Sequence, residues 1–169
     1  MRQLLVVEFI ALDGILEDTV AGLGLDAQRT TTAYLFGRRT YEQAASYWMA
    51  HPEDAGMAEH LAETPKYVIS KSLSWPKWPN TQVLGGGVTA AVNSLKARGE
   101  GNVVVLGSAQ LVRELVAENL VDAYRIYVSP VLLGAGRRLF DDVRTERDLR
   151  LVDCRPAGGG LVVLNYSAR

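Results

Sequence analysis

The sequence predicts an α/β domain with a mostly parallel central sheet, flanked by helices and finished by a C-terminal antiparallel hairpin. Short apolar runs alternate with segments of helical periodicity, which is typical of strands joined by crossover helices. The last quarter of the chain is β-rich, and residues 158–160 are three glycines suited to a hairpin turn. Because 169 residues are the size of one domain, we expect residues 1–169 to fold as a single domain.

The individual elements follow from local periodicity and turn signals. Residues 3–11 form a nearly continuous apolar strand, which ends at the Asp13-Gly14 turn. Further strands are predicted at residues 33–37, 66–70, 81–84, 102–106, 124–133, 149–154 and 161–166. Helices are predicted at residues 38–49 and 88–98, and after residue 106, where Leu111, Val112, Leu115, Val116 and Leu120 share one face. Parallel strands joined this way place their carboxyl ends at one edge of the sheet, where open α/β sheets bind ligands.

Composition and charge narrow the class of protein. Hydrophobic residues make up 48% of the chain and charged residues 22%, which is ordinary for a globular protein. The net charge of −1 creates no overall field for nucleic acid or an anionic membrane, so we expect neither partner. Glu8 and Asp13 interrupt the first apolar segment, and no uncharged stretch reaches membrane-spanning length, which predicts a cytoplasmic protein.

The cysteine and histidine content argues against disulfide and metal chemistry. Cys154 is the single cysteine, which excludes an intramolecular disulfide and a multi-cysteine metal site. His51 and His60 lie in a polar stretch without a third ligand nearby, so we predict no metal site. Any chemistry is therefore expected at the strand ends.

The first strand end of interest is the junction Gly37-Arg38-Arg39-Thr40. A strand that passes through glycine into a helix exposes backbone N–H groups at the helix start. Those donors, together with a guanidinium and the Thr40 hydroxyl, would form an anion site. The alternative is that Arg38 and Arg39 are ordinary solvated surface residues.

The second junction is Gly107-Ser108-Ala109-Gln110-Leu111. It is again a strand, a glycine and a helix, with Ser108 placed as the N-cap. Gly107 would let a pyrophosphate approach the backbone closely, although the further glycines of a GxGxxG fingerprint are absent. A tight turn between strand and helix is the alternative interpretation.

The third strand end is Ile69-Ser70-Lys71. Small hydroxyl and basic side chains just past a strand suit an adenosine ribose or its 2′-phosphate, although they could equally be surface residues. Two further glycine segments, 85–87 and 134–136, favour turns rather than phosphate binding.

Acid–base candidates are few. Asp13, at the end of the first strand, is the best placed for catalysis, although it could instead be an Asx-type turn residue. Glu8 lies within an apolar strand, where an isolated carboxylate would be costly, so it should pair structurally or reach the cleft; the first is favoured. Glu17 and Asp26 belong to a polar segment that could form a lid.

The order of these motifs resembles a known family. The segments FIALDG, LFGRRTYE, KYVISKSL, VVVLGSAQLVREL and VDAYRIYVSPVLLGAGRRLF occur in this order along residues 2 to 167. Together they resemble dihydrofolate-reductase-like proteins related to the C-terminal reductase domain of the bifunctional riboflavin-biosynthesis deaminase-reductase. The resemblance implies a dihydrofolate-reductase-like fold, NADPH as the hydride donor and a homodimer.

The resemblance also assigns residues by position. It implies that Gly37, Arg38, Arg39 and Thr40 hold the dinucleotide phosphates. It implies that Ile69, Ser70 and Lys71 hold the adenosine and its 2′-phosphate, and that Gly107, Ser108, Ala109, Gln110 and Leu111 lie under the pyrophosphate. Residues 11–14, from Ala11 to Gly14, are implied beside the nicotinamide and the substrate. There Asp13, the catalytic candidate named above, or a bound water would supply the proton.

The departures from the family bear on the substrate. Folate reductases carry consecutive glycines where this chain has Gly107-Ser108-Ala109, and no counterpart of their pterin-protonating carboxylate is found. The zinc-binding cysteines of the deaminase half are absent as well. The resemblance therefore implies a free-standing reductase similar to 5-amino-6-(5-phosphoribosylamino)uracil reductase, which passes hydride to a C=N or C=O carbon of a pterin- or pyrimidine-like small molecule.

Two alternatives to a reductase stay open. The chain could be a non-catalytic NADP-binding or regulatory module on the same fold, or a structural dimer without a ligand. For the homodimer, the apolar residues Tyr124, Ile126, Tyr127 and Val128 are expected to be exposed and to form the interface.

Overall fold

The computed structural model describes residues 2–17, 30–53 and 55–169, which form eight strands and four helices. The strands are β1 (Gln3–Ala11), β2 (Thr31–Gly37), β3 (Lys66–Ile69), β4 (Thr81–Leu84), β5 (Asn102–Val105), β6 (Ala123–Ser129), β7 (Leu149–Pro156) and β8 (Val162–Ala168). The helices are α2 (Arg38–Ala50), α3 (Ala55–Glu63), α4 (Val88–Ala97) and α5 (Ala109–Ala117). All of these elements except α3 lie where the sequence predicts a strand or a helix.

The eight strands form one sheet, in the order β4-β3-β2-β5-β1-β6-β8-β7. The strands from β4 to β6 run parallel, and β8 pairs antiparallel with both β6 and β7. The turn from β7 to β8 passes through residues 158–160, whose positive φ angles of 80°, 59° and 81° favour glycine. The predicted mostly parallel sheet with a C-terminal antiparallel hairpin is therefore confirmed.

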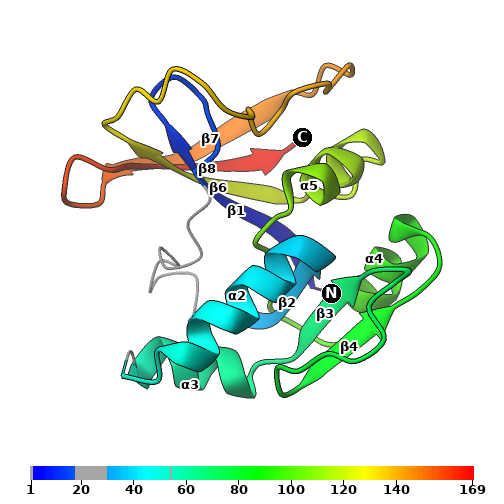
Figure 1. The fold of residues 1–169 in the computed structure, drawn as a ribbon. Helices are drawn as coiled ribbons and strands as arrows, with labels where there is room; N and C mark the ends of the chain where they lie inside the picture. Colours follow the sequence, from blue (N-terminus) through cyan, green and yellow to red (C-terminus); the bar gives the residue numbers. More distant parts are fainter. Residues whose placement is uncertain (1, 18–29, 54) are drawn as a thin grey trace.

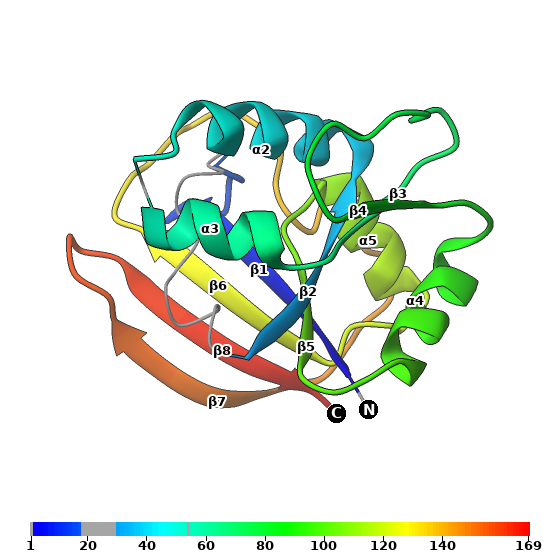
Figure 2. The same cartoon turned by 90° about the horizontal axis from the view of Figure 1, so that it is seen from below.

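Helices cover both faces of the sheet, as Figures 1 and 2 show. The α4 and α5 helices pack on one face and the α2 and α3 helices on the other. The central strand β1 contributes Leu4 and Val6 to the first core and Leu5 and Val7 to the second. A strand buried on both faces reads as a continuous apolar run, which explains the pattern of residues 3–11.

The carboxyl-terminal half of β1 stands apart from β5. Pairing between these two strands ends at Val6 and Val105, whereas β1 stays paired with β6 as far as Ala11 and Ser129. The sheet therefore opens between residues 8–11 and the loop that follows β5. This opening positions the candidate site.

The strand predicted at residues 124–133 is shorter in the structure, because β6 ends at Ser129. Pro130 has no N–H group to continue the ladder. The next residue, Val131, instead accepts a hydrogen bond on its carbonyl oxygen from the backbone N–H of Leu12, at 2.9 Å. The segment after β6 thus becomes a loop that contacts the turn after β1.

The predicted dimer surface on β6 was wrong. Tyr124, Ile126 and Tyr127 are each only 6% exposed and belong to the two cores, and Val128 is partly buried. These side chains alternate between the two faces of the sheet, and helices cover both faces. The apolar character of this strand therefore reflects burial in the core and not an exposed surface. Large exposed apolar residues lie instead at Val131, Leu132, Leu133, Leu151 and Val152.

Within the described ranges, no helix combines the length and apolar character needed to cross a bilayer. The same part of the chain holds no group of three or more His, Cys, Asp or Glu side chains placed for a metal ion. Asp26, suggested above as part of a lid, lies outside the described residues.

Candidate cofactor and substrate site

Three adjoining cavities follow the carboxyl-end edge of the sheet. The outer cavity is lined by Gly37, Arg38, Arg39, Glu42, Ile69, Ser70, Lys71, Ser72, Ser108, Gln110, Leu111 and Glu114. The polar cavity is lined by Glu8, Leu16, Glu17, Arg39, Thr40, Gln43, Leu106, Gly107, Ser108, Ala109, Gln110 and Arg137. The apolar cavity is lined by Val7, Glu8, Phe9, Phe36, Thr40, Ala44, Trp48, Leu61, Trp78 and Leu106. Because each cavity shares lining residues with the next, the three form one cleft.

The structure brings the three predicted strand ends together at this cleft. Every residue predicted to bind the cofactor lines the outer or the polar cavity, with the exception of Ala11. Ala11 is fully buried, and its backbone N–H donates to the carbonyl oxygen of Ile15 at 2.8 Å, which closes the turn after β1. Binding by these residues stays a prediction, but their proximity is observed.

The ends of β2 and β5 touch through their glycines. The N–H of Gly37 donates to the carbonyl oxygen of Gly107 at 3.1 Å. A Cβ atom on Gly37 would lie 2.7 Å from Ser108 Oγ, which is shorter than a van der Waals contact. Gly107 has a φ of +82°, which side-chain-bearing residues rarely adopt, and the Gly107–Ser108 peptide bond is cis. The two glycines therefore allow the starts of α2 and α5 to lie side by side.

Both helix starts are suited to an anion. The α2 helix follows Gly37, which provides no side-chain cap, and its first turn holds no acidic residue. The α5 helix is capped by Ser108, as predicted, whose Oγ accepts from the N–H of Leu111 at 3.4 Å. Its first turn is also free of acidic residues. The partial positive charge of two helix starts is thus directed at one place.

The outer cavity is organised around Arg38. Its Nε lies 2.8 Å from Glu42 Oε1, and its Nη1 donates to Ser72 Oγ at 2.6 Å. Ser70 Oγ accepts from the backbone N–H groups of Ser72 and Leu73, at 3.2 and 3.1 Å. These contacts fix the loop after β3 beside the start of α2, with the Lys71 side chain exposed at the rim.

Asp13 ties the turn after β1 to the loop after β6. Its Oδ2 accepts from the N–H of Gly134 at 2.8 Å, and Arg138 Nη1 donates to its backbone oxygen at 2.5 Å. The Gly134 hydrogen bond lowers the pKa of Asp13, which favours the ionised carboxylate. The observed contacts are structural, and a catalytic role for Asp13 stays a prediction.

Comparison with known proteins then identifies the family. The model described as the RibD C-terminal domain matches residues 25–163. The chain belongs to the RibD C-terminal domain family. The resemblance that the motif order indicates is thereby confirmed.

Solved structures agree on the fold. A protein of Shewanella sp. PV-4 assigned to riboflavin biosynthesis superposes with a TM-score of 0.79 at 16% identity, over 99% of both chains. The Thermotoga maritima diaminohydroxyphosphoribosylaminopyrimidine deaminase/5-amino-6-(5-phosphoribosylamino)uracil reductase gives 0.69 at 14% identity, over 99% of this chain and 57% of that one. The Enterococcus faecalis dihydrofolate reductase, complexed with NADP(H), gives 0.67 at 14% identity, over 99% and 96%. The dihydrofolate-reductase-like fold is confirmed.

Sequence reasoning missed several residues of this RibD C-terminal domain that line the polar cavity. For Glu8, structural pairing was favoured over the cleft, and the structure places it at the cleft, where it lines both the polar and the apolar cavity. Arg137 also lines the polar cavity, and its backbone oxygen accepts from the N–H of Leu16 at 2.8 Å. Glu17 accepts a hydrogen bond from the Ser129 hydroxyl. The available signal was the charge of Glu8 within an apolar strand.

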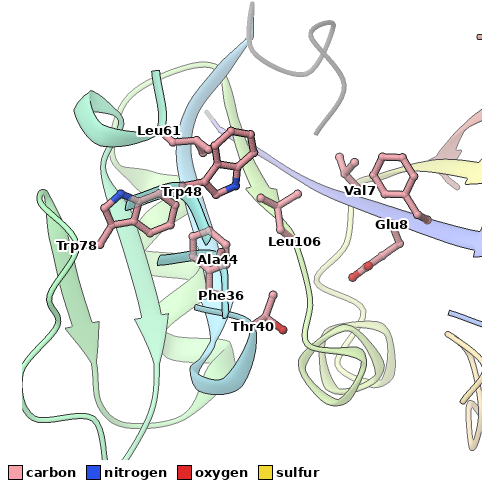
Figure 3. Close-up of a pocket in the computed structure, with 10 residues that line it drawn as sticks. Val7, Glu8, Phe36, Thr40, Ala44, Trp48, Leu61, Trp78 and Leu106 are labelled. Carbon is pink, nitrogen blue, oxygen red and sulfur yellow. The ribbon is translucent and has the colours of Figure 1, made fainter. Parts of the chain in front are cut away.

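The apolar cavity depends on side chains that no motif marks. Trp78, which is buried, lines it from the loop between β3 and β4 (Figure 3). Fully buried Lys66 lies 4.9 Å from the Trp78 ring centre. The Lys66 Nζ donates to three carbonyl oxygens at the end of α3. These belong to Leu61, to Ala62 at 3.3 Å and to Thr64 at 2.7 Å. Lys66 thereby fixes α3 and Trp78 around the cavity.

Proposed function

We propose that this chain is an NADPH-dependent reductase that transfers hydride to a C=N or C=O carbon of a pterin- or pyrimidine-like small molecule. The activity would be similar to that of 5-amino-6-(5-phosphoribosylamino)uracil reductase. The observation that carries the proposal is the contact between two strand–glycine–helix junctions, around Gly37 and Gly107. They lie at one part of a cleft whose other part is apolar and aromatic.

The residues present fit NADPH. The contact between Gly37 and Gly107 leaves no room for a side chain at Gly37, and it brings the starts of α2 and α5 next to each other. Anionic pyrophosphate suits those helix starts together with Arg39 and Thr40. The outer cavity offers Arg38, Ser70 and Lys71 to the adenosine ribose and its 2′-phosphate. This donor set supports NADPH rather than NADH.

When bound, NADPH supplies the hydride. The chain's own residues position the reactants, and positioning can account for much of the rate. The turn from Ala11 to Gly14 would hold the nicotinamide side of the cleft, and the apolar cavity would exclude water from the substrate ring. Because the Gly134 N–H favours the ionised form of Asp13, we assign proton delivery to a bound water in preference to that carboxyl.

The decisive experiment follows NADPH absorbance with a panel of oxidised pyrimidine and pterin compounds. We expect substrate-dependent oxidation by the wild-type chain and none by Gly37→Val, whose branched side chain would collide with Ser108. NADPH binding without turnover over the whole panel would instead support a non-catalytic NADP-binding module. If NADPH neither binds nor raises the melting temperature, the reductase proposal and that module both fail.

We also propose that the chain forms a homodimer, on a surface different from the one first expected. Leu132 is 72% exposed and Val152 61% exposed, on the loop after β6 and on the edge strand β7. Exposed apolar side chains and an unpaired strand edge favour association. Sedimentation should give twice the chain mass for the wild type and a single chain mass for Leu132→Asp/Val152→Asp. The cytoplasmic location stays a prediction.

A further inference from the structure

A separate cavity, called the remote cavity below, lies at the opposite edge of the sheet from the cleft. It is formed where α5 ends, β6 and β7 begin and β8 ends, and its volume is about 240 Å³. Figure 1 shows the end of β8 beside α5. The remote cavity shares no lining residue with the three cavities of the cleft. A ligand bound here is therefore neither the cofactor nor the substrate.

The floor of the remote cavity is apolar. Val116 and Val121 are 5% and 4% exposed, and Leu149 joins them from the start of β7. All three side chains belong to the core that α4 and α5 cover, or pack against it. Such a floor favours the aliphatic part of a ligand, because binding removes apolar surface from water.

Tyr124 brings a buried polar group to this floor. It is 6% exposed, and its ring contacts Phe140 edge to face with the ring centres 6.1 Å apart. Its hydroxyl has no hydrogen-bond partner in the described part of the chain. Burial raises the pKa of Tyr124, and the charge of Arg147 acts in the opposite direction. A buried hydroxyl without a partner, beside a guanidinium, is suited to an anionic acceptor.

Charged side chains of both signs surround the apolar floor. Arg147 and Arg169 supply cations, and Glu146 and Asp148 supply carboxylates. Within the ranges that the structure describes, none of these four side chains takes part in an ion pair. Arg147 Nη2 donates to the carbonyl oxygen of Ala117 at 3.4 Å, which holds the guanidinium at the end of α5. An anion alone or a cation alone would meet a like charge here, whereas a ligand carrying both charges would match the rim.

We propose that the remote cavity binds a small zwitterion with an aliphatic side chain, of the size of a branched amino acid. The carboxylate of the ligand accepts hydrogen bonds from the Tyr124 hydroxyl and from the Arg147 guanidinium. Its ammonium group donates to the carboxylates of Glu146 and Asp148. Its aliphatic part packs on the apolar floor, which explains why a tyrosine hydroxyl opens into an otherwise apolar surface.

The test uses L-leucine as the probe and two analogues that each lack one charge. The analogue 4-methylpentanoate lacks the ammonium group, and isoamylamine lacks the carboxylate. Binding is followed by the backbone amide signals of the isotope-labelled chain. The variants are Tyr124→Phe, which removes only the hydroxyl, and Arg147→Gln. Their matched controls are Tyr67→Phe and Arg144→Gln, because neither of these side chains lines the remote cavity.

We expect L-leucine to shift the signals of residues 116–124 and 146–149 in a saturable way. Tyr124→Phe should weaken L-leucine binding about fivefold and Arg147→Gln about tenfold, while both controls keep the wild-type affinity. Each analogue should bind about tenfold more weakly than L-leucine, because one charged group of the rim then has no partner.

Three results would overturn the proposal. These are the absence of a saturable shift with L-leucine, wild-type affinity in both Tyr124→Phe and Arg147→Gln, and analogues that bind as tightly as L-leucine. If Tyr124→Phe does not fold, the comparison of Arg147→Gln with Arg144→Gln decides alone, since both arginines are exposed in the same loop.

Discussion

The outer and polar cavities differ from the apolar cavity in the way the chain builds them. The first two are made mainly of three short contiguous segments, each at the end of a strand, and two of these segments contain a glycine. The apolar cavity is made of single side chains from β1, β2, α2, α3 and two loops. Contiguous segments with glycine leave a signature in the sequence, whereas a cavity assembled from scattered side chains does not.

This difference predicts that the region built from contiguous segments fails through small steric changes. We expect Gly37→Ala to show the largest effect, because its Cβ would lie 2.7 Å from Ser108 Oγ and force the β2 and β5 ends apart. NADPH affinity should fall on the order of 100-fold, which corresponds to the loss of about 3 kcal/mol of phosphate contacts. Calorimetric titration with NADPH measures it.

The matched control for that substitution is Gly85→Ala. Gly85 has no heavy atom within 4 Å of its would-be Cβ, so NADPH affinity and melting temperature should be unchanged. Equal behaviour of the two variants would contradict the claim that the glycine contact builds the cofactor site.

The side-chain-built region should instead fail through loss of packing support. We expect Lys66→Met to destabilise the fold by about 2 kcal/mol, because carbonyl oxygens at the end of α3 lose a buried charged donor. Urea unfolding measures the change. NADPH affinity should change little, since Lys66 lies outside the outer and polar cavities.

The same lysine gives a pH signature. Burial lowers the pKa of Lys66 from 10.5 to about 8, so between these values the unfolded chain holds a proton that the folded chain has lost. The free energy of unfolding should therefore rise with pH from about 8 to 10.5 in the wild type relative to Lys66→Met. If the difference in unfolding free energy between the wild type and Lys66→Met stayed constant from about pH 8 to 10.5, the lowered pKa of Lys66 would be contradicted.

The two regions also explain how much could be predicted from the sequence. The strand–glycine–helix junctions at Gly37 and Gly107 are local, so their residues were identified without a structure. Glu8 was recognised as anomalous, but its destination depends on where β5 leaves β1, which is a tertiary fact. Trp78 and Lys66 could not be paired in advance because Lys66 is held by the end of α3, a helix that was not predicted.

The prediction of which residues form a dimer surface failed for a related reason. A β-rich apolar segment looks the same in sequence whether helices or solvent cover it. Tyr124 and Tyr127 are buried because they face different helix-covered layers, while the edge strand β7 is exposed on both faces. Sheet order, not composition, decides which strand is at the edge.

A further prediction sharpens the cofactor assignment within the outer cavity. We expect Arg38→Ala and Lys71→Ala each to weaken NADPH binding about tenfold and to leave NADH binding unchanged, because a cation contact to the 2′-phosphate is lost. Lys77→Ala, an exposed lysine further along the same loop, is the control. Equal affinities of the wild type for the two dinucleotides would refute the 2′-phosphate assignment.

The smallest expected effect concerns Asp13, which lies in the turn after β1 and lines none of the three cavities. Backbone donors, with Gly134 first, lower the pKa of Asp13 in the folded chain, so its contribution to stability is present above the unfolded pKa and lost as pH falls through the folded value. The melting temperature of Asp13→Asn should therefore lie slightly below that of the wild type at pH 7, and the two should converge in acid. A residual rate of NADPH oxidation in Asp13→Asn near that of the wild type would agree with proton delivery by water. A loss of turnover with unchanged melting temperature would instead show that the Asp13 carboxylate takes part in the reaction. The reacting groups would then include the turn after β1 as well as the polar cavity.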